Sequence, residues 1–411
     1  MSKKRFIDLF AGCGGLSLGL KSAGWQGVFA VEKTPDAFST LKHNLIDKDI
    51  VFPFDWPEWL PCGPTTTSEL IANYSSQLQG LRGSIDLIAG GPPCQGFSFA
   101  GRRNPNDPRN RLTEEYIQIV ELVQPKFLLL ENVKGFKSAF KQEKNMPDKG
   151  KIYAEVVKEK LEAIGYRVFH KILKASKFGV PQPRPRFIMI AIHKDQVVDA
   201  SPFELLEAFL PNYRKEKGLD PERDVSVKEA ISDLETAQAT LIPSVDSKGF
   251  EQIKYTPLKL SPYQRLMREK CNVDLIPNSL RLAHHNLDTL KRFKKILCAY
   301  EKGKCLTKAE LEGLGTKKRS FTPLHPEMPS RTITTLPDDL LHYSEPRILT
   351  VRENARLQSF PDWFEFKGKY ATGGKLRKIE CPRYTQVGNA VPPLMAEALG
   401  KVIQILGEID D

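Results

Sequence analysis

The sequence lacks the features that would place it in a membrane or around a zinc ion. It has no apolar run of membrane-spanning length, and its opening residues, 1–5, lead into a strand-like segment and not into a signal peptide. Its seven cysteines, an odd number, include no CxxC pair and no Cys/His cluster at zinc spacing. We therefore expect a cytoplasmic protein with reduced thiols, no membrane anchor and no metal.

Acidic residues are outnumbered, which points to a polyanionic partner. The 411 residues contain 61 Lys and Arg against 50 Asp and Glu, a net charge of +11. Between Glu251 and Ser320 the counts are 16 and 7, so this segment alone carries +9. A basic segment of this kind is typical of a nucleic-acid-binding face, although an ordinary solvated surface would give the same composition.

The start of the chain has the order of strand, glycine turn and helix that opens a nucleotide-binding α/β unit. Arg5–Phe10 is the expected strand and Ala11–Gly15 the turn. The turn does not complete the NAD fingerprint, because Ser17 stands at the position of its third glycine. Glu32 ends the next expected strand, where a carboxylate can accept hydrogen bonds from ribose hydroxyls.

The segment Gly90–Ser98 places a cysteine shortly after a buried strand. The apolar run Ile85–Ala89 predicts that strand, and two glycines and two prolines end it just before Cys94. Ligands of open α/β sheets bind at the carboxyl edge, and a thiolate there is a strong nucleophile. The loop Gly101–Arg111 that follows is long enough to move as a lid.

Two carboxylates stand near the ends of other expected strands. Glu131 comes directly after the apolar run Lys126–Leu130, where a charged side chain is seldom part of a core. We expect it at the same sheet edge as Cys94, one strand along. Asp55 lies about where a third strand would end, and it either accepts a hydrogen bond from an adenine amino group or is an ordinary turn aspartate.

Polar side chains recur at every second residue in the segment 182–186. The prolines between them exclude a helix and favour an extended chain, which would present Gln182, Arg184 and Arg186 on one side. A row of Gln and Arg side chains suits a phosphate group or a base edge.

A cofactor turn, a thiol and a carboxylate together suit covalent activation of a cytosine ring. C5 of cytosine is too weak a nucleophile to take a methyl group directly, but addition of a thiolate at C6 makes C5 enamine-like. This addition needs a proton or a strong hydrogen bond at N3, which a carboxyl group supplies. Cys94 and Glu131 could divide these two tasks between them.

These segments resemble the motifs of the DNA (cytosine-5) methyltransferases and occur in the order of that family. Asp8–Gly15 is similar to the family's S-adenosyl-L-methionine turn, Pro92–Gln95 to its nucleophile motif and Glu131–Val133 to its acid motif. Gln182–Arg186 resembles its QxRxR motif and Gln386–Pro393 its closing GN motif. The resemblance covers most of residues 4–194 and 325–406 and includes the segments Pro329–Thr335 and Arg347–Asp362.

The resemblance implies a role for each matching residue. Cys94 would be the nucleophile, Glu131 the partner of N3 and Arg186 a contact to the cytosine O2 of a flipped-out base. The residues that would line the S-adenosyl-L-methionine site are Phe10, Gly12, Gly14, Gly15, Glu32, Asp55, Pro92, Asn389 and Ala390. The residues that would contact DNA are Gln95, Ser98, Gln182 and Arg184.

The expected fold class is α/β, with a Rossmann-like, S-adenosyl-L-methionine-dependent methyltransferase domain. Its mostly parallel, twisted sheet would carry helices on both faces. Residues 1–195 and 325–411 would form this domain, and the inserted, basic residues 196–324 a smaller target-recognition domain. Thr350–Phe360 predicts a helix with Arg352 and Arg356 on one face.

The expected function is methylation of cytosine C5 within a specific double-stranded DNA site. We expect a monomer on DNA, within a restriction-modification or related defence system and with possible associated restriction or defence proteins. An RNA cytosine-5 methyltransferase of the same fold would use the same Cys94 and Glu131, but the large basic insertion favours DNA. A DNA-binding regulator without catalysis is the other alternative, and the intact Cys94, Glu131 and Arg186 argue against it.

Overall fold

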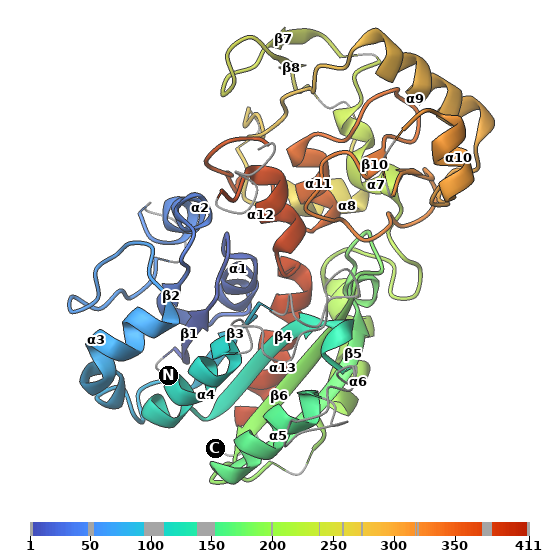
Figure 1. The fold of residues 1–411 in the computed structure, drawn as a ribbon. Coiled ribbons are helices and arrows are strands. Elements are labelled where there is room, and N and C mark those ends of the chain that lie inside the picture. Colours follow the sequence, from blue (N-terminus) through green and yellow to red (C-terminus); the bar gives the residue numbers. More distant parts are fainter. Residues whose placement is uncertain are drawn as a thin grey trace, which may run out of the picture. The chain divides into compact units, whose positions relative to one another are not determined.

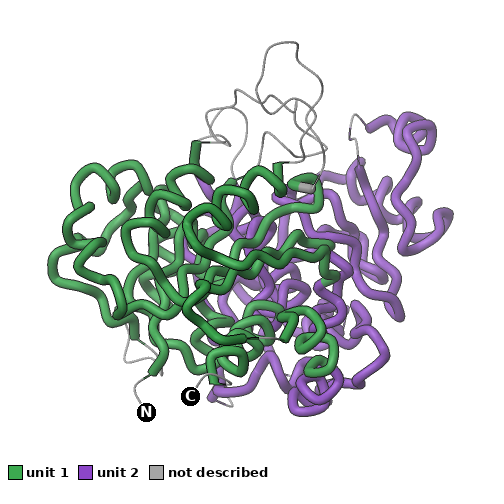
Figure 2. The backbone as a smooth tube through the Cα atoms, turned by 90° about the horizontal axis from the view of Figure 1, so that it is seen from below, with its two compact units in different colours: residues 1–174, 185–210, 395–411 green, residues 175–184, 211–394 purple. Residues whose placement is uncertain are grey.

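The computed structural model describes residues 3–47, 53–93, 111–137, 153–198, 200–237, 239–256, 259–272, 274–316, 318, 320–371 and 380–408. The chain forms two compact units, coloured separately in Figure 2. Unit 1 contains residues 1–174, 185–210 and 395–411, and unit 2 contains residues 175–184 and 211–394. In the described part of the chain, no helix is both long and apolar enough to cross a lipid bilayer.

Unit 1 is built on a six-stranded sheet with the order β2-β1-β3-β4-β6-β5 (Figure 1). The first four strands in this order are parallel neighbours, whereas β6 runs antiparallel to both β4 and β5. This confirms the predicted mostly parallel sheet. The strands are β1 (Arg5–Leu9), β2 (Gln26–Val31), β3 (Leu87–Gly90), β4 (Phe127–Val133), β5 (Tyr166–Lys174) and β6 (Pro185–His193).

Helices cover both faces of this sheet. Successive side chains of a strand point to opposite faces, so the apolar residues of these strands need a covering layer on each face. On one face, Ile7 and Leu9 share a core cluster with Tyr116 of α4, whose hydroxyl donates to the Ile88 carbonyl at 3.2 Å. On the other face, Asp8 meets α1. The helical elements of unit 1 are α1 (Gly15–Ser22), α2 (Pro35–Leu45), α3 (Thr67–Gln79), α4 (Arg111–Val123), η2 (Lys134–Lys137) and α5 (Tyr153–Ala163). Two further helices, α6 (Pro202–Glu216) and α13 (Pro393–Glu408), each have residues in both units, and η3 (Ala175–Phe178) belongs to unit 2.

Unit 2 consists of short elements, and several of its helices begin with a capping box. In each box a Ser or Thr side chain accepts from the backbone N–H three residues on, and the Glu or Gln there bonds back to the cap. The elements are α7 (Val227–Ile231), η4 (Ser232–Leu234), β7 (Leu241–Pro243), β8 (Glu251–Ile253), α8 (Pro262–Met267), α9 (Leu287–Ala299), α10 (Lys308–Gly313), β9 (Thr322–Pro323), β10 (Leu340–Leu341), α11 (Val351–Leu357) and α12 (Arg383–Asn389).

Buried ion pairs hold unit 2 together. Arg356 of α11 is 0% exposed and lies 2.6 Å from a carboxylate oxygen of Asp362 and 3.0 Å from one of Asp233. Arg352 is also 0% exposed and donates to main-chain carbonyl oxygens. The predicted helix 350–360 therefore exists, but both of its arginines lie inside the unit, where their partners offset the cost of desolvating the charge.

The two units do not coincide with the predicted domains. Residues 196–210 pack with unit 1, whereas residues 325–394 pack with the inserted segment in unit 2. The predicted division follows motif order and charge, whereas the units follow the contacts between segments. The assignment of target recognition to residues 196–324 therefore stays a prediction.

Candidate active site

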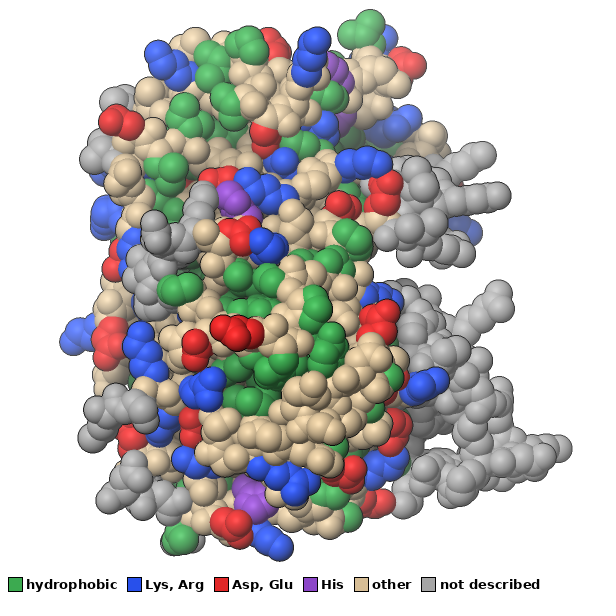
Figure 3. Space-filling view, turned by 90° about the vertical axis from the view of Figure 1, so that its left-hand side faces the viewer, with side chains coloured by type: hydrophobic (Ala, Val, Ile, Leu, Met, Phe, Trp, Pro, Cys, Tyr) green, Lys and Arg blue, Asp and Glu red, His purple; other side chains and the backbone are tan. Residues whose placement is uncertain are grey.

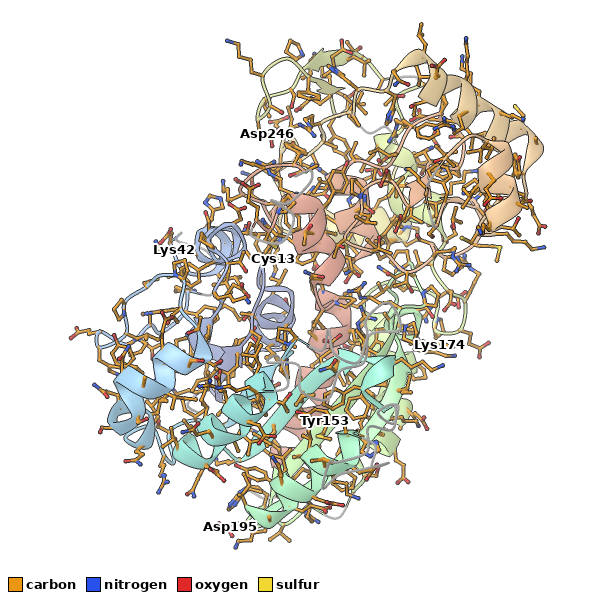
Figure 4. The ribbon with its side chains drawn as sticks, in the orientation of Figure 1. Cys13, Lys42, Tyr153, Lys174, Asp195 and Asp246 are labelled. Carbon is orange, nitrogen blue, oxygen red and sulfur yellow. The ribbon has the colours of Figure 1, made fainter. Side chains whose placement is uncertain are left out.

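The turn after β1 leaves open space above its backbone. Phe10, Gly12 and Gly14 adopt the left-handed region, with φ of 63°, 57° and 95°. A Cβ built on Gly12 would meet no atom within 4 Å, and Gly15 begins α1 directly afterwards. Cys13, labelled in Figure 4, is only 2% exposed, as expected for a packing residue rather than a nucleophile. Backbone N–H groups at such a helix start attract an anionic group.

Glu32 is tied to this turn. One of its carboxylate oxygens accepts a hydrogen bond from the Gly12 N–H at 3.0 Å, and the other accepts from the Thr34 N–H at 2.7 Å. The side chain is half-buried beside the carboxyl end of β2. The structure thus brings the predicted Phe10, Gly12, Gly14, Gly15 and Glu32 to one place.

Asp55 lies elsewhere. Its backbone N–H donates to the Gly27 carbonyl at 2.8 Å, and its carboxylate pairs with Arg5 at 3.4 Å. Gly27 and Arg5 stand at the starts of β2 and β1, so Asp55 is at the amino edge of the sheet, away from Glu32. The predicted adenine contact does not fit this position; from the same segment it is Thr65 that reaches Glu32, through a bond from its N–H to the Glu32 carbonyl at 3.0 Å.

Glu131 and Arg186 form an ion pair where β4 and β6 run side by side. Arg186 pairs with Val133 in the antiparallel register, and its Nε lies 2.7 Å from Oε1 of Glu131. Both side chains are 13% exposed. The predicted strand ended at Leu130, but β4 continues to Val133 because β6 pairs with it, so Glu131 lies within the strand.

The backbone that leads to Cys94 lies close to Glu131 and is held by a hydrogen bond from Asn132. A Cβ on Gly91 would lie 3.3 Å from Oε2 of Glu131, and the buried Asn132 side chain donates to the Pro92 carbonyl at 3.0 Å. Cys94 follows two residues later, and it lies outside the described residues. Gln95, Ser98 and positions 101–110 of the predicted lid lie outside them as well, while Arg111 begins α4.

Gln182 and Arg184 do not share the surface of Arg186. Arg184 has a φ of 27°, so the segment is not extended, and the two side chains are 0% and 1% exposed. The Gln182 amide donates to the carbonyl of Leu357 and to the side chain of Gln358, each at 2.7 Å. The predicted DNA contacts of these two residues do not fit their burial, because their polar groups bind atoms of unit 2.

Arg184 connects segments that are far apart in the sequence. Its guanidinium donates to the carbonyls of Ile333 at 3.0 Å, Gly388 at 2.7 Å and Ala390 at 3.0 Å. Asn389 is exposed at the end of α12 and Ala390 is half-buried. Both belong to unit 2, so their contact with a cofactor at the glycine turn stays a prediction.

Asp8 is a buried carboxylate for which the sequence motifs predict no role. It is 0% exposed, Oδ2 accepts from the Ser17 hydroxyl at 2.5 Å, and Oδ1 has no hydrogen-bond partner among the described residues. Burial, helped by the charge of Glu32, raises the pKa of Asp8 to about 7. A charged residue inside the apolar run Phe6–Phe10 was the signal that could have drawn attention to it.

We expect Asp8 to make stability depend on pH. Between about pH 4 and pH 7 the folded chain holds a proton on Asp8 that the unfolded chain has released, so its contribution to stability falls as the pH rises. Relative to Asp8→Asn, the free energy of unfolding of the wild type should decrease by about 1.4 kcal/mol per pH unit in this window. Urea denaturation of both proteins at several pH values measures this, and parallel profiles would contradict it.

Comparison with known proteins agrees with this arrangement. The model of the family described as C-5 cytosine-specific DNA methylase matches residues 4–405. The Type II methyltransferase M.DdeI of Desulfomicrobium norvegicum is 30% identical over 409 residues, 97% of this chain and 88% of that protein. M.XorII of Xanthomonas oryzae pv. oryzae is also 30% identical, over 97% of this chain and 84% of its own length.

Solved structures show the same fold. A DNA modification methyltransferase encoded within an E. coli prophage superposes with a TM-score of 0.66 at 25% identity, covering 98% of this chain and 99% of that one. S. pombe Dnmt2 superposes with a TM-score of 0.53 at 16% identity, with 99% of each chain covered, which speaks for the fold alone. The chain therefore belongs to the C-5 cytosine-specific DNA methylase family and is a DNA (cytosine-5) methyltransferase.

Proposed function

We propose that the enzyme transfers a methyl group to C5 of a flipped-out cytosine in a specific duplex DNA site, through a covalent bond between Cys94 and C6. The observation that carries this proposal is the Glu131–Arg186 ion pair beside the Gly91–Pro92 backbone. It puts an acid and a cation next to the chain segment that leads to the thiol. A thiolate can reach C6 only from above the ring, so the base has to leave the stack.

Each side chain then has one task. The Cys94 thiolate forms the bond to C6 while Glu131 shares its proton with N3, and Arg186 donates to O2; together they place the electron pair at C5. When bound, S-adenosyl-L-methionine supplies the methyl group. Loss of the C5 proton to a base and expulsion of the thiolate from C6 restore the aromatic ring and the free enzyme.

The cofactor site fits S-adenosyl-L-methionine. The open space above Gly12 and the start of α1 suit a carboxylate, and Glu32 keeps lone pairs for ribose hydroxyls beyond its bonds to Gly12 and Thr34. Phe10, Gly14, Gly15 and Pro92 would complete the unit 1 side of this site, and Asn389 and Ala390 would approach it from α12. Asp55 is left out.

We assign DNA contacts to Gln95, Ser98 and the basic residues of 196–324. Gln182 and Arg184 instead act as positioning residues that join the segments around Ile333, Leu357 and Gly388. On the face drawn in Figure 3, described Lys and Arg side chains are interspersed with acidic ones.

The Type II relatives support a role in restriction-modification. Such an enzyme would act in the cytoplasm, bound to chromosomal DNA. Bisulfite sequencing of DNA from cells that express the chain tests the function, because it detects methylation of cytosine at C5 and gives the recognised sequence. RNA from the same cells is the comparison. Methylated RNA with unmethylated DNA would favour the RNA alternative, and absence of both would favour a regulator.

Exchange of the basic insertion should move the methylated site. A chimera in which the corresponding segment of a related enzyme replaces residues 196–324 should methylate the DNA site of that enzyme, because side chains of the insertion read the bases. Binding should weaken with salt at a slope of roughly 0.9 per phosphate neutralised. Bisulfite sequencing measures the outcome, and an active chimera that keeps the original site would refute the assignment.

A further inference from the structure

Unit 2 contains a cavity that the methyl-transfer chemistry does not use. It has a volume of about 350 Å³ and lies between α9, α10 and the segments that contain Ala283 and Pro337. The helices are the orange elements of Figure 1. This volume is at the lower end of the ~300–1,000 Å³ range of small-molecule sites.

The floor of the cavity is apolar and aromatic. Phe293, Ile296, Phe321 and Ile348 line it and belong to one core cluster. The rings of Phe293 and Phe321 are stacked at 5.5 Å between centroids, with 21° between their planes. Such a floor suits a flat aromatic ring.

The mouth of the cavity carries hydrogen-bond donors. The Nε of Arg292 donates to the Leu314 carbonyl at 2.9 Å, which holds the guanidinium in place, and its terminal nitrogens make no hydrogen bond to the described residues. Lys318 is already paired with Asp338, at 2.5 Å. Among the described residues that line the cavity, Arg292 is therefore the cation that remains available to an anion.

His285 adds a neutral donor. Its Nε2 accepts from the Ile348 N–H at 3.4 Å. Burial, together with Lys318, Arg347 and His284, lowers the pKa of His285, so the ring is neutral at pH 7 and carries its proton on Nδ1. The Thr289 hydroxyl lies at the same cavity.

We propose that this cavity binds a nucleotide, with its base against Phe293 and Phe321 and its phosphate on Arg292. An apolar aromatic floor with one available cation at the rim matches a heteroaromatic ring joined to a phosphate. The nucleotide comes either from the DNA substrate, in which case it is an unstacked residue other than the target cytosine, or from the free pool. The DNA form of the inference rests on the proposed function.

The test titrates the full chain with each of the four deoxynucleoside 5′-monophosphates and follows saturation transfer to their ring protons by NMR. Excess S-adenosyl-L-methionine occupies the cofactor site. Arg292→Gln is compared with Lys291→Gln, which removes the same charge from an exposed neighbour on α9 that does not line the cavity. Circular dichroism of each protein shows that it is folded, and DNA methylation by the wild type shows that the preparation is active.

At least one nucleotide should bind the wild type and Lys291→Gln equally and bind Arg292→Gln about tenfold more weakly, because a charge-assisted hydrogen bond is lost. Displacement by duplex DNA that contains the recognised site assigns the cavity to the DNA, and persistence of binding assigns it to free nucleotide. Equal binding to all three proteins, or no binding to a wild type that methylates DNA, overturns the inference and leaves the proposed function standing. If nucleotide binding depends on Arg292 but the wild type methylates no DNA, the cavity inference stands and the proposed function fails.

Discussion

Cys94→Ala should transfer no measurable methyl group to DNA. Loss of a catalytic nucleophile lowers the rate by roughly 10⁶-fold in well-studied hydrolases, and C5 of cytosine has no other route to activation here. The measurement is incorporation of labelled methyl groups into duplex DNA under single-turnover conditions. The variant should still bind DNA, because the thiol contributes to chemistry and not to the phosphate contacts.

A trapping experiment sharpens this test. DNA with 5-fluorocytosine at the target position should become covalently attached to the wild type, because fluorine at C5 cannot leave as a proton. Cys94→Ala should form no such complex. A variant that methylates at the wild-type rate, or that is trapped as well as the wild type, would exclude the covalent mechanism.

Glu131→Gln should fold and bind cofactor but methylate about 10²–10⁴-fold more slowly, the typical contribution of general acid catalysis. Glutamine keeps the shape of the side chain but replaces the carboxyl group, which pairs with Arg186 at 2.7 Å when ionised and can give a proton to N3 when protonated. Single-turnover methylation measures the effect. Glu121→Gln, an exposed glutamate on α4, is the matched control and should match the wild type.

Two other measurements distinguish chemistry from folding in this variant. Unchanged circular dichroism and cofactor affinity would show that the Arg186 pairing is not needed for the fold. An unchanged single-turnover rate in a folded Glu131→Gln would remove Glu131 from the mechanism, whatever its distance from Arg186.

The sheet could be predicted from sequence because its parallel strands are buried on both faces. Runs such as Phe127–Leu130 are therefore apolar throughout. Glu131 stands out in the sequence because a carboxylate directly after a buried apolar run is seldom part of a core. The motif resemblance assigns Arg186, 55 residues later in the sequence, to the same cytosine, but it does not predict the ion pair between the two side chains.

The failures have one physical cause. Counting strands predicts that Asp55 lies at the end of a third strand. The chain from Asp55 to Thr65 is irregular, however, and its length does not show which edge of the sheet each residue reaches. Gln182 and Arg184 were placed by a period of two, but a left-handed residue at Arg184 ends that period. Their hydrogen-bond partners lie up to 206 residues away in the sequence, and no local pattern records such contacts.

If residues 196–324 read the DNA sequence, as we propose, the ion pairs of Arg356 restrict how this enzyme can acquire a new specificity. Arg356 and Asp362 lie outside the basic insertion, whereas Asp233 lies inside it, so a foreign insertion has to bring its own acid to that place. An insertion without one would leave a buried guanidinium short of a partner, at a cost of roughly 3–5 kcal/mol. Recombination between relatives would therefore be filtered by compatibility at position 233, independently of the DNA sequence that the incoming segment recognises.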